Sequence, residues 1–171
     1  MAATVAHGFQ SILGIGAEVT AGTPVAATVK VPYLSEDLTE QFEEILDNSL
    51  CGSAARTIGQ QGTQIVEGGF DLHWRYTLSF LLLTHFFGTL SVDTPVVGTN
   101  TYQLDPNIDG DALTVAIEKT VSVWEFAGFK VNEMVISGSP TDGLMIDVDG
   151  FAVNLDLSSV LNTTATLAAL A

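Results

Sequence analysis

The sequence predicts a mainly β protein with antiparallel strands and a single helix. First, residues 112–153 contain runs in which apolar, often β-branched residues alternate with polar ones, the period of a half-buried antiparallel strand. Second, clusters of turn-forming residues separate these runs, as at residues 138–143. Third, only residues 77–87 place a leucine-rich set on one helical stripe, with Thr77 as the expected N-cap and Gly88 as the expected stop.

Residues 1–28 are rich in glycine, alanine and threonine, which predicts an extended arm with turns. Within it, Gly14-Ile15-Gly16 looks like the start of a dinucleotide-binding loop. However, Val19 stands where the third glycine belongs, and no strand clearly precedes the motif. A lone motif without its strand–helix context is usually a chance match, so no cofactor is predicted.

Residues 29–50 allow two interpretations. Leu38, Phe42, Ile45 and Leu46 have helical spacing, and on periodicity alone a helix is favoured. A strand would also place Leu38, Phe42 and Leu46 on one face, together with Glu36, Glu40 and Glu44. The acidic block is either an ordinary solvated face or an anionic wall; its members are Glu36, Asp37, Glu40, Glu43, Glu44 and Asp47.

The middle of the chain alternates between loops and strands. Residues 51–64 are small and polar, which predicts a long surface loop that is functional or disordered. A strand is expected over residues 65–76, with Gly68-Gly69 as a bulge or kink. After the helix, residues 91–101 read as a turn-rich connection and 101–104 as a short strand.

The remaining strands meander through residues 112–153. Gly128 interrupts one run, and the alternation slips at Glu133-Met134 and at Gly150, which predicts bulges that bend a sheet. Residues 162–171 have no turn or cap that closes them. The expected divisions are therefore an arm (1–28), a β domain (29–157) and a C-terminal tail (158–171), the chain being either a short protein or a fragment.

Composition narrows the function. With 20 acidic and 5 basic residues the formal net charge is −15, which disfavours binding to DNA or anionic membranes but is compatible with DNA sliding past. The apolar share of 47% and mean hydropathy of +0.37 suggest that some surface is buried in subunit contacts. No signal peptide is read, and the longest apolar run, residues 80–87, is too short for a membrane helix, so no membrane anchor and a cytoplasmic product are expected.

Candidate chemical sites are weak. Residues 105–110 match the first half of a calcium loop, but Ala116 stands where the bidentate Glu belongs and Glu118 comes two residues late, so an Asx-rich turn is favoured. Cys51 is the only cysteine and has no nearby histidine, so neither a disulfide nor a nucleophile is expected.

The histidines and one carboxylate pair support no catalytic site either. His7, His73 and His85 are too scattered for a metal site, and His85 falls on the apolar stripe of the helix, where a packed histidine is expected. Asp147 and Asp149 share a strand face, as chance allows in so acidic a chain. No enzymatic activity and no metal are predicted.

Several segments resemble, in order, the tail tube proteins of long-tailed bacteriophages. They are residues 14–28, 34–38 and 68–72, the helix ending in Phe87-Gly88-Thr89, and residues 116–120, 126–134 and 149–151. The resemblance implies a β-sandwich or barrel with one flanking helix. It also implies homo-hexameric rings stacked into a tube in the virion tail, which other tail proteins meet at its ends and through which DNA passes without specific binding. In such proteins the segment 33–50 is extended, so a strand is expected there against the helical periodicity.

Two surfaces follow from this resemblance. Six copies would carry −90 per ring, and either Glu36, Glu40 and Glu44 or the opposite parity, Asp37, Glu43 and Asp47, are expected to line the channel. The arm (8–28) and the loop (51–64) are expected to contact neighbouring subunits or rings. The candidate contact residues are Gly14, Gly16, Thr23, Pro24, Gly52, Ser53, Arg56 and Gln60.

Two alternatives stay open. An immunoglobulin-like β-sandwich acting as an adhesin or capsid decoration would share the strand meander but remain monomeric or trimeric. A calcium-dependent module would depend on residues 105–110 and respond to a chelator.

Overall fold

The chain folds mainly into antiparallel strands, as the alternation predicts. The computed structural model describes residues 11–45, 60–96, 99–106, 111–119, 122–141 and 143–170. The strands are β1 (Leu13–Ala17), β2 (Val29–Val31), β3 (Ser35–Glu36), β4 (Thr39–Ile45), β5 (Gln60–His73), β6 (Gly88–Val96), β7 (Thr99–Pro106), β8 (Leu113–Glu118), β9 (Val123–Ser139), β10 (Gly143–Ala152) and β11 (Asn154–Asp156). Two helices accompany them, α1 (Tyr76–Phe87) and α2 (Thr164–Ala168).

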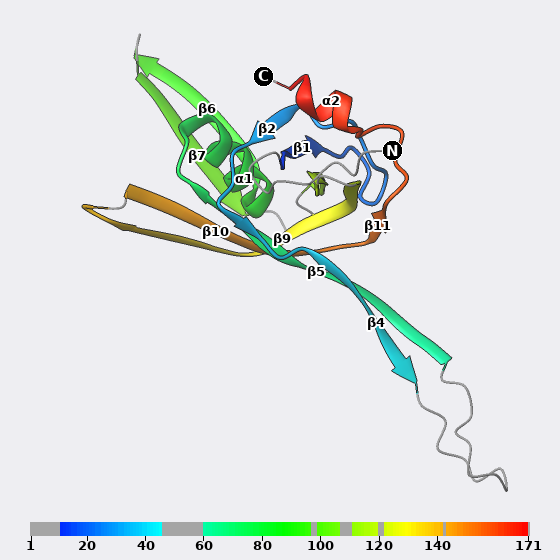
Figure 1. Cartoon of the computed structure of the whole chain (residues 1–171). Helices are drawn as coiled ribbons and strands as arrows, with labels where there is room; N and C mark the ends of the chain where they lie inside the picture. The colour runs from blue at the N-terminus through cyan, green and yellow to red at the C-terminus, as the bar shows by residue number, and fades with distance from the viewer. Residues whose placement is uncertain are drawn as a thin grey trace, which may run out of the picture.

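Strand β9 connects two layers that enclose the core (Figure 1). Its first half pairs with β8 and β11, and β8 leads on to β1 and β2; this is the first layer. Its second half pairs with β10, which leads on to β5 and then to β3 and β4; this is the second layer. Buried side chains of both layers meet between them, and Leu78 and Leu82 of α1 join the same cluster.

The predicted bulge at Gly150 is confirmed. Asp149 pairs with Glu133 but Gly150 pairs with Val131, which leaves Asn132 as the extra residue of β9. A second irregularity, between Leu113 and Val115 of β8, faces Gly128, whose φ is 69°. Both bulges bend β9, which explains how one strand can serve both layers.

Replacing Gly150 by valine should destabilise the fold. A Cβ at this position would lie 2.3 Å from the carbonyl oxygen of Lys130 and 2.6 Å from Cζ of Phe129. We expect the free energy of unfolding, measured in urea, to fall by about 2–3 kcal/mol. Gly143→Asn is the control: Gly143 has φ 77° and open space around a Cβ, and asparagine tolerates this conformation. An equal loss in both variants would contradict the packing argument.

The segment after Tyr33 is extended, as the resemblance implied, and the helix favoured by periodicity is wrong. Strands β3 and β4 pair with β5, and their cross-strand hydrogen bonds outweigh the weak helical pattern. Between them the chain passes Gly68, whose Cβ would lie 2.7 Å from the carbonyl oxygen of Asp37. Gly68 has φ 125°, so the predicted kink in β5 exists because only glycine fits there.

Helix α1 is where the leucine stripe predicted it, but its N-cap is not. Arg75 is the cap residue and makes no side-chain cap bond, so the expected role of Thr77 is wrong. Ser79 Oγ accepts from the Arg75 N–H at 3.0 Å, which satisfies that donor from inside the helix. Gly88 ends the helix in the left-handed conformation, as predicted.

The expected turn-rich connection over residues 91–101 is also wrong. Strand β6 runs through most of it and pairs with β7 as a separate two-stranded hairpin, which projects from the α1 end of the molecule (Figure 1). The turn-forming residues Asp93 and Pro95 lie at a register shift between Asp93 and Val96, so the hairpin accommodates them as an irregularity.

The N-terminal segment is part of the first layer. Strand β1 lies between β2 and β8, and its Leu13 and Ile15 are fully buried in the core. The outer face of β1 is covered in turn: a Cβ at Gly14 would lie 2.7 Å from Cδ2 of Leu167, which is itself buried. The C-terminal segment therefore packs on the N-terminal strand.

A buried carboxylate connects three segments near strand β1 through hydrogen bonds. Glu18 is 3% exposed, and its Oε1 accepts from the Thr114 hydroxyl at 2.7 Å and the Gly128 N–H at 2.8 Å. Its Oε2 accepts from the Gly22 N–H at 2.8 Å. Three segments, namely the loop after β1, strand β8 and the bulge of β9, thus share one hydrogen-bonded carboxylate.

Candidate functional site

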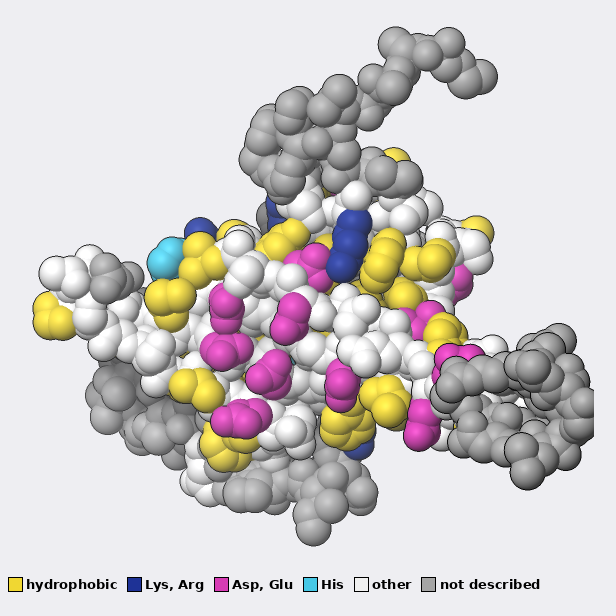
Figure 2. All heavy atoms as spheres, turned by 60° about the horizontal axis from the view of Figure 1, so that its bottom comes forward, with side chains coloured by type: hydrophobic (Ala, Val, Ile, Leu, Met, Phe, Trp, Pro, Cys, Tyr) yellow, Lys and Arg dark blue, Asp and Glu magenta, His cyan; other side chains and the backbone are white. Residues whose placement is uncertain are grey.

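The second layer has an outer face that is strongly acidic. Side chains alternate along a strand, so every second residue of β3–β4, β5, β10 and the second half of β9 points away from the core. The registers align these residues in rows across the layer: Ser35, Asp71, Asp147 and Val135; Asp37, Gly69, Asp149 and Glu133; Thr39, Glu67, Phe151 and Lys130. We call Asp37, Glu67, Asp71, Glu133, Asp147 and Asp149 the acidic face; Figure 2 shows carboxylates gathered in the middle of this surface.

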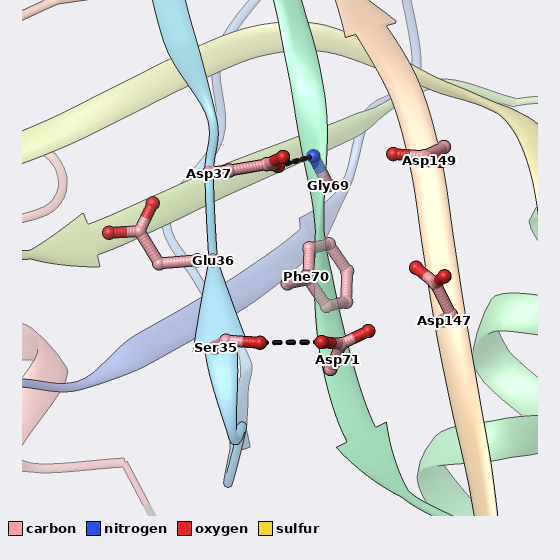
Figure 3. A pocket seen from close by; sticks show the side chains of 8 residues that line it. All are labelled: Ser35, Glu36, Asp37, Gly69, Phe70, Asp71, Asp147 and Asp149. Atoms are coloured by element: carbon pink, nitrogen blue, oxygen red, sulfur yellow. Dashed lines mark hydrogen bonds between the residues drawn. The ribbon is translucent and has the colours of Figure 1, made fainter.

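A hollow in this face is lined mainly by carboxylates and polar groups (Figure 3). The Ser35 hydroxyl donates to Asp71 Oδ2, and the Gly69 N–H donates to Asp37 Oδ1 at 2.6 Å. Asp147 has Asp71 beside it on β5 and Asp149 two residues further along β10. Partial burial, followed by the charges of Asp71 and Asp149, raises the pKa of Asp147 above its ordinary value. The neighbouring carboxylates of the acidic face therefore repel one another when they are ionised.

Asp147→Asn should stabilise the protein at neutral pH. The pKa of Asp147 is raised in the folded state. Its contribution to stability is therefore greatest below pH 3.8, where the carboxyl is protonated in both the folded and the unfolded state. This contribution is lost as the pH rises through the folded-state pKa. Asparagine cannot ionise, so the variant should gain at most about 1 kcal/mol at pH 7 at this solvent-facing site. Urea unfolding at several pH values tests this. A gain that persisted unchanged below pH 3.8 would contradict it.

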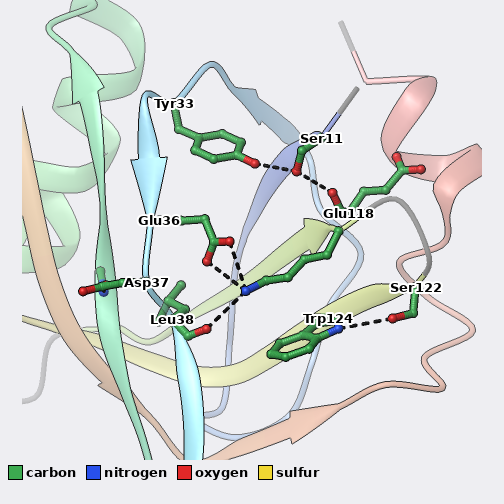
Figure 4. Close-up of polar contacts among 10 residues, drawn as sticks. Ser11, Tyr33, Glu36, Asp37, Leu38, Glu118, Ser122 and Trp124 are labelled. Atoms are coloured by element: carbon green, nitrogen blue, oxygen red, sulfur yellow. Dashed lines mark hydrogen bonds and ion pairs between the residues drawn. The ribbon is translucent and has the colours of Figure 1, made fainter. Parts of the chain in front are cut away.

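The structure gathers only some of the predicted channel residues. Asp37 lies on the acidic face. Glu36 points to the other side of its strand, where it forms an ion pair with Lys119 at 3.0 Å (Figure 4). The same ammonium lies 4.2 Å from the centre of the Trp124 ring. Glu36 thus helps to tie β3 to the end of β8.

The other predicted channel residues lie along the hairpin of β4 and β5. Glu40 is half-buried and accepts from the Gln64 side chain. Glu43 and Glu44 are exposed on β4, and Asp47 lies outside the described residues. Glu67, Asp71 and Glu133 were not predicted to be members of a common surface. Their alternation was visible, but only the strand registers show that they meet.

The described members of the predicted contact set lie in the N-terminal segment and at the start of β5. Gly14 and Gly16 are buried against the chain's own residues. Thr23 is exposed in a turn, where its N–H donates to the Thr20 carbonyl, and Pro24 is half-buried. Gln60 is exposed at the start of β5 opposite Ile45. Gly52, Ser53 and Arg56 lie outside the described residues.

The second layer ends in an unpaired strand on each side, within the part of the chain that the structure describes. Strand β8 covers β9 only as far as Phe129, which leaves Lys130–Ser139 as the open β9 edge. On the other side, β3 and β4 pair with β5 alone and form the open β3–β4 edge. Both edges carry exposed apolar residues, Val135 and Ile136 on one and Phe42 and Ile45 on the other. Such edges are templates for further strand pairing.

The hairpin of β4 and β5 continues far beyond both layers (Figure 1). Phe42, Ile45 and Ile65 are 44–54% exposed along it, with no core beneath them. A two-stranded hairpin is marginally stable by itself in water, and exposed apolar residues of this size usually mark a contact surface. This hairpin therefore has the features of a segment that packs on another molecule.

No arrangement for metal binding or membrane crossing is found in the described part of the chain. No three His, Cys, Asp or Glu residues there are placed to hold a metal ion. Of the predicted calcium loop, Asp105 and Pro106 end β7, and residues 107–110 lie outside the described residues. Neither described helix is long and apolar enough to cross a membrane.

Comparisons with known proteins give one family. The family model described as "Phage tail tube protein" matches residues 8–171. No curated protein sequence matches the chain. A chain of the extended sheath–tube complex of the PVC extracellular contractile injection system is 10% identical and superposes with a TM-score of 0.49, covering 92% of this chain and 94% of that one. A chain of the anti-feeding prophage cap is 8% identical, with a TM-score of 0.47 and coverage of 94% and 95%.

Proposed function

Because the chain belongs to the phage tail tube protein family, we propose that six copies close into a ring, that rings stack into a tube, and that the acidic face lines its bore. The observation that carries this proposal is a continuous acidic layer that ends on both sides in an open strand edge. The protein would act in the virion tail after synthesis in the host cytoplasm, with other tail proteins at the tube ends. Its role would be structural and not enzymatic.

Strand polarity supports closure by edge-to-edge pairing. All pairs in the second layer are antiparallel, so β9 runs opposite to β3 and β4 at the far edge. The open β9 edge of one copy can then continue the sheet beside the open β3–β4 edge of the next without a change of pattern. Such a contact joins two different surfaces, and this type of interface closes into rings or grows into filaments.

The acidic face supports an electrostatic role for the bore. Proteins bind DNA phosphates through Lys and Arg side chains. In the three rows of the acidic layer, Lys130 is the only residue of either type. A bore covered with carboxylates would repel DNA from its wall, which favours transit without adsorption.

Electron microscopy of the concentrated protein tests this function. We expect hollow tubes and, in end-on class averages, six-fold rings. Single-copy or trimeric particles at every concentration would instead support the decoration or adhesin alternative. Assembly only after calcium is added would support the calcium-dependent module.

Reversing charge in the bore should make DNA adhere. In tubes of Asp147→Lys/Asp149→Lys, two exposed carboxylates per copy become ammonium groups. We expect labelled duplex DNA to co-sediment with these tubes at low salt and to be released as salt increases, whereas wild-type tubes retain none. Tubes of Asp111→Lys/Asp156→Lys, in which two carboxylates outside the acidic face are reversed, control for net charge. Equal retention by both variants would exclude the acidic face as the bore.

A further inference from the structure

We propose that Lys130 determines how neighbouring copies meet: its ammonium group on the open β9 edge of one copy pairs with carboxylates on the open β3–β4 edge of the next. This inference rests on the proposed ring and names the contact that gives the ring its direction. The partner is a second copy of this chain.

Lys130 occupies a distinctive position. It is the first residue of β9 beyond the stretch that β8 covers, so its side chain lies at the open edge. It belongs to the row of Phe151, Glu67 and Thr39 on the outer face of the layer. It forms no ion pair with any described residue, whereas Lys119 is paired with Glu36. The open β9 edge therefore presents one cation that is not in an ion pair, with Glu133 in the next row of the same edge.

The opposite edge presents the complementary charge. Asp37, Glu43 and Glu44 are exposed along it, and Glu36 is already engaged with Lys119. If two copies met with their strands in line, Thr39 of one copy would lie directly beside Lys130 of the next. Strands in a closed sheet are tilted, so neighbouring edges are offset along the strand. An offset of two residues in one direction brings Lys130 beside Asp37, and a larger offset in the other direction brings it beside Glu43 or Glu44.

This charge pattern selects among the ways in which two edges can meet. Each copy carries a net charge of −15, so copies repel one another in most orientations. Pairing of two β3–β4 edges would bring acidic edges together. Two-fold antiparallel pairing of two β9 edges over their open length would place Lys130 opposite Ser139, which offers no carboxylate. Both are two-fold contacts that stop at a dimer. Only the contact of β9 with β3–β4 matches opposite charges and propagates around a ring.

Charge reversal tests the proposal. Lys130→Glu should raise the protein concentration at which tubes first sediment by about tenfold or more, because like charges would face each other across the contact. Lys30→Glu is the matched control, since Lys30 is exposed on β2 of the first layer and the net charge change is the same. Its effect should be less than about twofold. Thermal unfolding of each variant verifies that the monomer is folded.

A rescue separates a specific pair from a general charge effect. Lys130→Glu is combined in turn with Asp37→Lys, Glu43→Lys and Glu44→Lys, and each is compared with the corresponding single variant. At least one combination should restore assembly at a concentration within about threefold of wild type. Assembly of Lys130→Glu at the wild-type concentration, or failure of all three combinations, would overturn the inference. Failure of the wild-type protein itself to form rings would instead overturn the proposed function.

Discussion

Joining Phe42 to Gln64 through an Asn-Gly turn should yield a folded protein that does not form tubes. The two residues lie directly opposite each other in the hairpin, so a two-residue turn can connect them without changing the register. The excision removes residues 43–63, whose described members are mostly exposed and contribute nothing to the buried core. The monomer should therefore unfold at nearly the same temperature. Tubes should be lost because the projecting hairpin is the segment expected to pack on neighbouring subunits or rings.

Point variants give a milder form of the same experiment. Ile45→Asp places a charge on the hairpin at a residue that is 54% exposed, and Val160→Asp does so at an apolar residue outside it. Assembly, followed by sedimentation and electron microscopy, should be impaired in the first variant and normal in the second. Normal tubes from the excised protein would exclude the hairpin from the assembly contacts.

Glu18→Ala should produce the largest loss of stability among single substitutions considered. The carboxylate accepts hydrogen bonds from Thr114, Gly128 and Gly22, and its removal leaves these donors without their partner in a buried site. Each unsatisfied buried donor costs roughly 1–3 kcal/mol, so we expect the free energy of unfolding to fall by about 3–5 kcal/mol. Chemical unfolding followed by circular dichroism measures this.

Two controls accompany this variant. Glu18→Gln keeps one oxygen acceptor and should lose clearly less stability than Glu18→Ala. Glu133→Ala removes an exposed carboxylate from the acidic face and should change stability by no more than about 0.5 kcal/mol. A loss in Glu18→Ala no greater than in Glu133→Ala would show that the buried network does not hold these segments together.

The strands and the main helix could be predicted because their signals are local. Alternation over residues 112–153 and the leucine stripe before Gly88 depend on neighbouring residues alone, and the phase slip at Gly150 revealed the bulge. The segment after Tyr33 could not be assigned from its own pattern, since it is extended only because β5 pairs with it. The strand β6 was not predicted for the same reason. Its hydrogen bonds with β7 outweigh the turn-forming tendency of Asp93 and Pro95.

The candidate site was only partly predictable because it is assembled by register. Asp147 and Asp149 were visible as a pair on one strand face, but chance was a sufficient explanation until β5 placed Asp71 beside them. Glu18 lies in the segment for which an extended arm was expected, and no role was predicted for it. Its burial follows from contacts with Thr114 and Gly128, about one hundred residues away in the chain.

The number of strands in the second layer sets the diameter of any tube that six copies would form. Strands in a sheet lie about 4.8 Å apart, so six four-stranded layers give a circumference of at least about 115 Å and a backbone diameter of about 37 Å, which strand tilt would increase. Side chains take up about 5 Å on each side, leaving an opening of about 27 Å. This clearance exceeds the width of one DNA duplex but not of two abreast, so the genome would have to travel in single file.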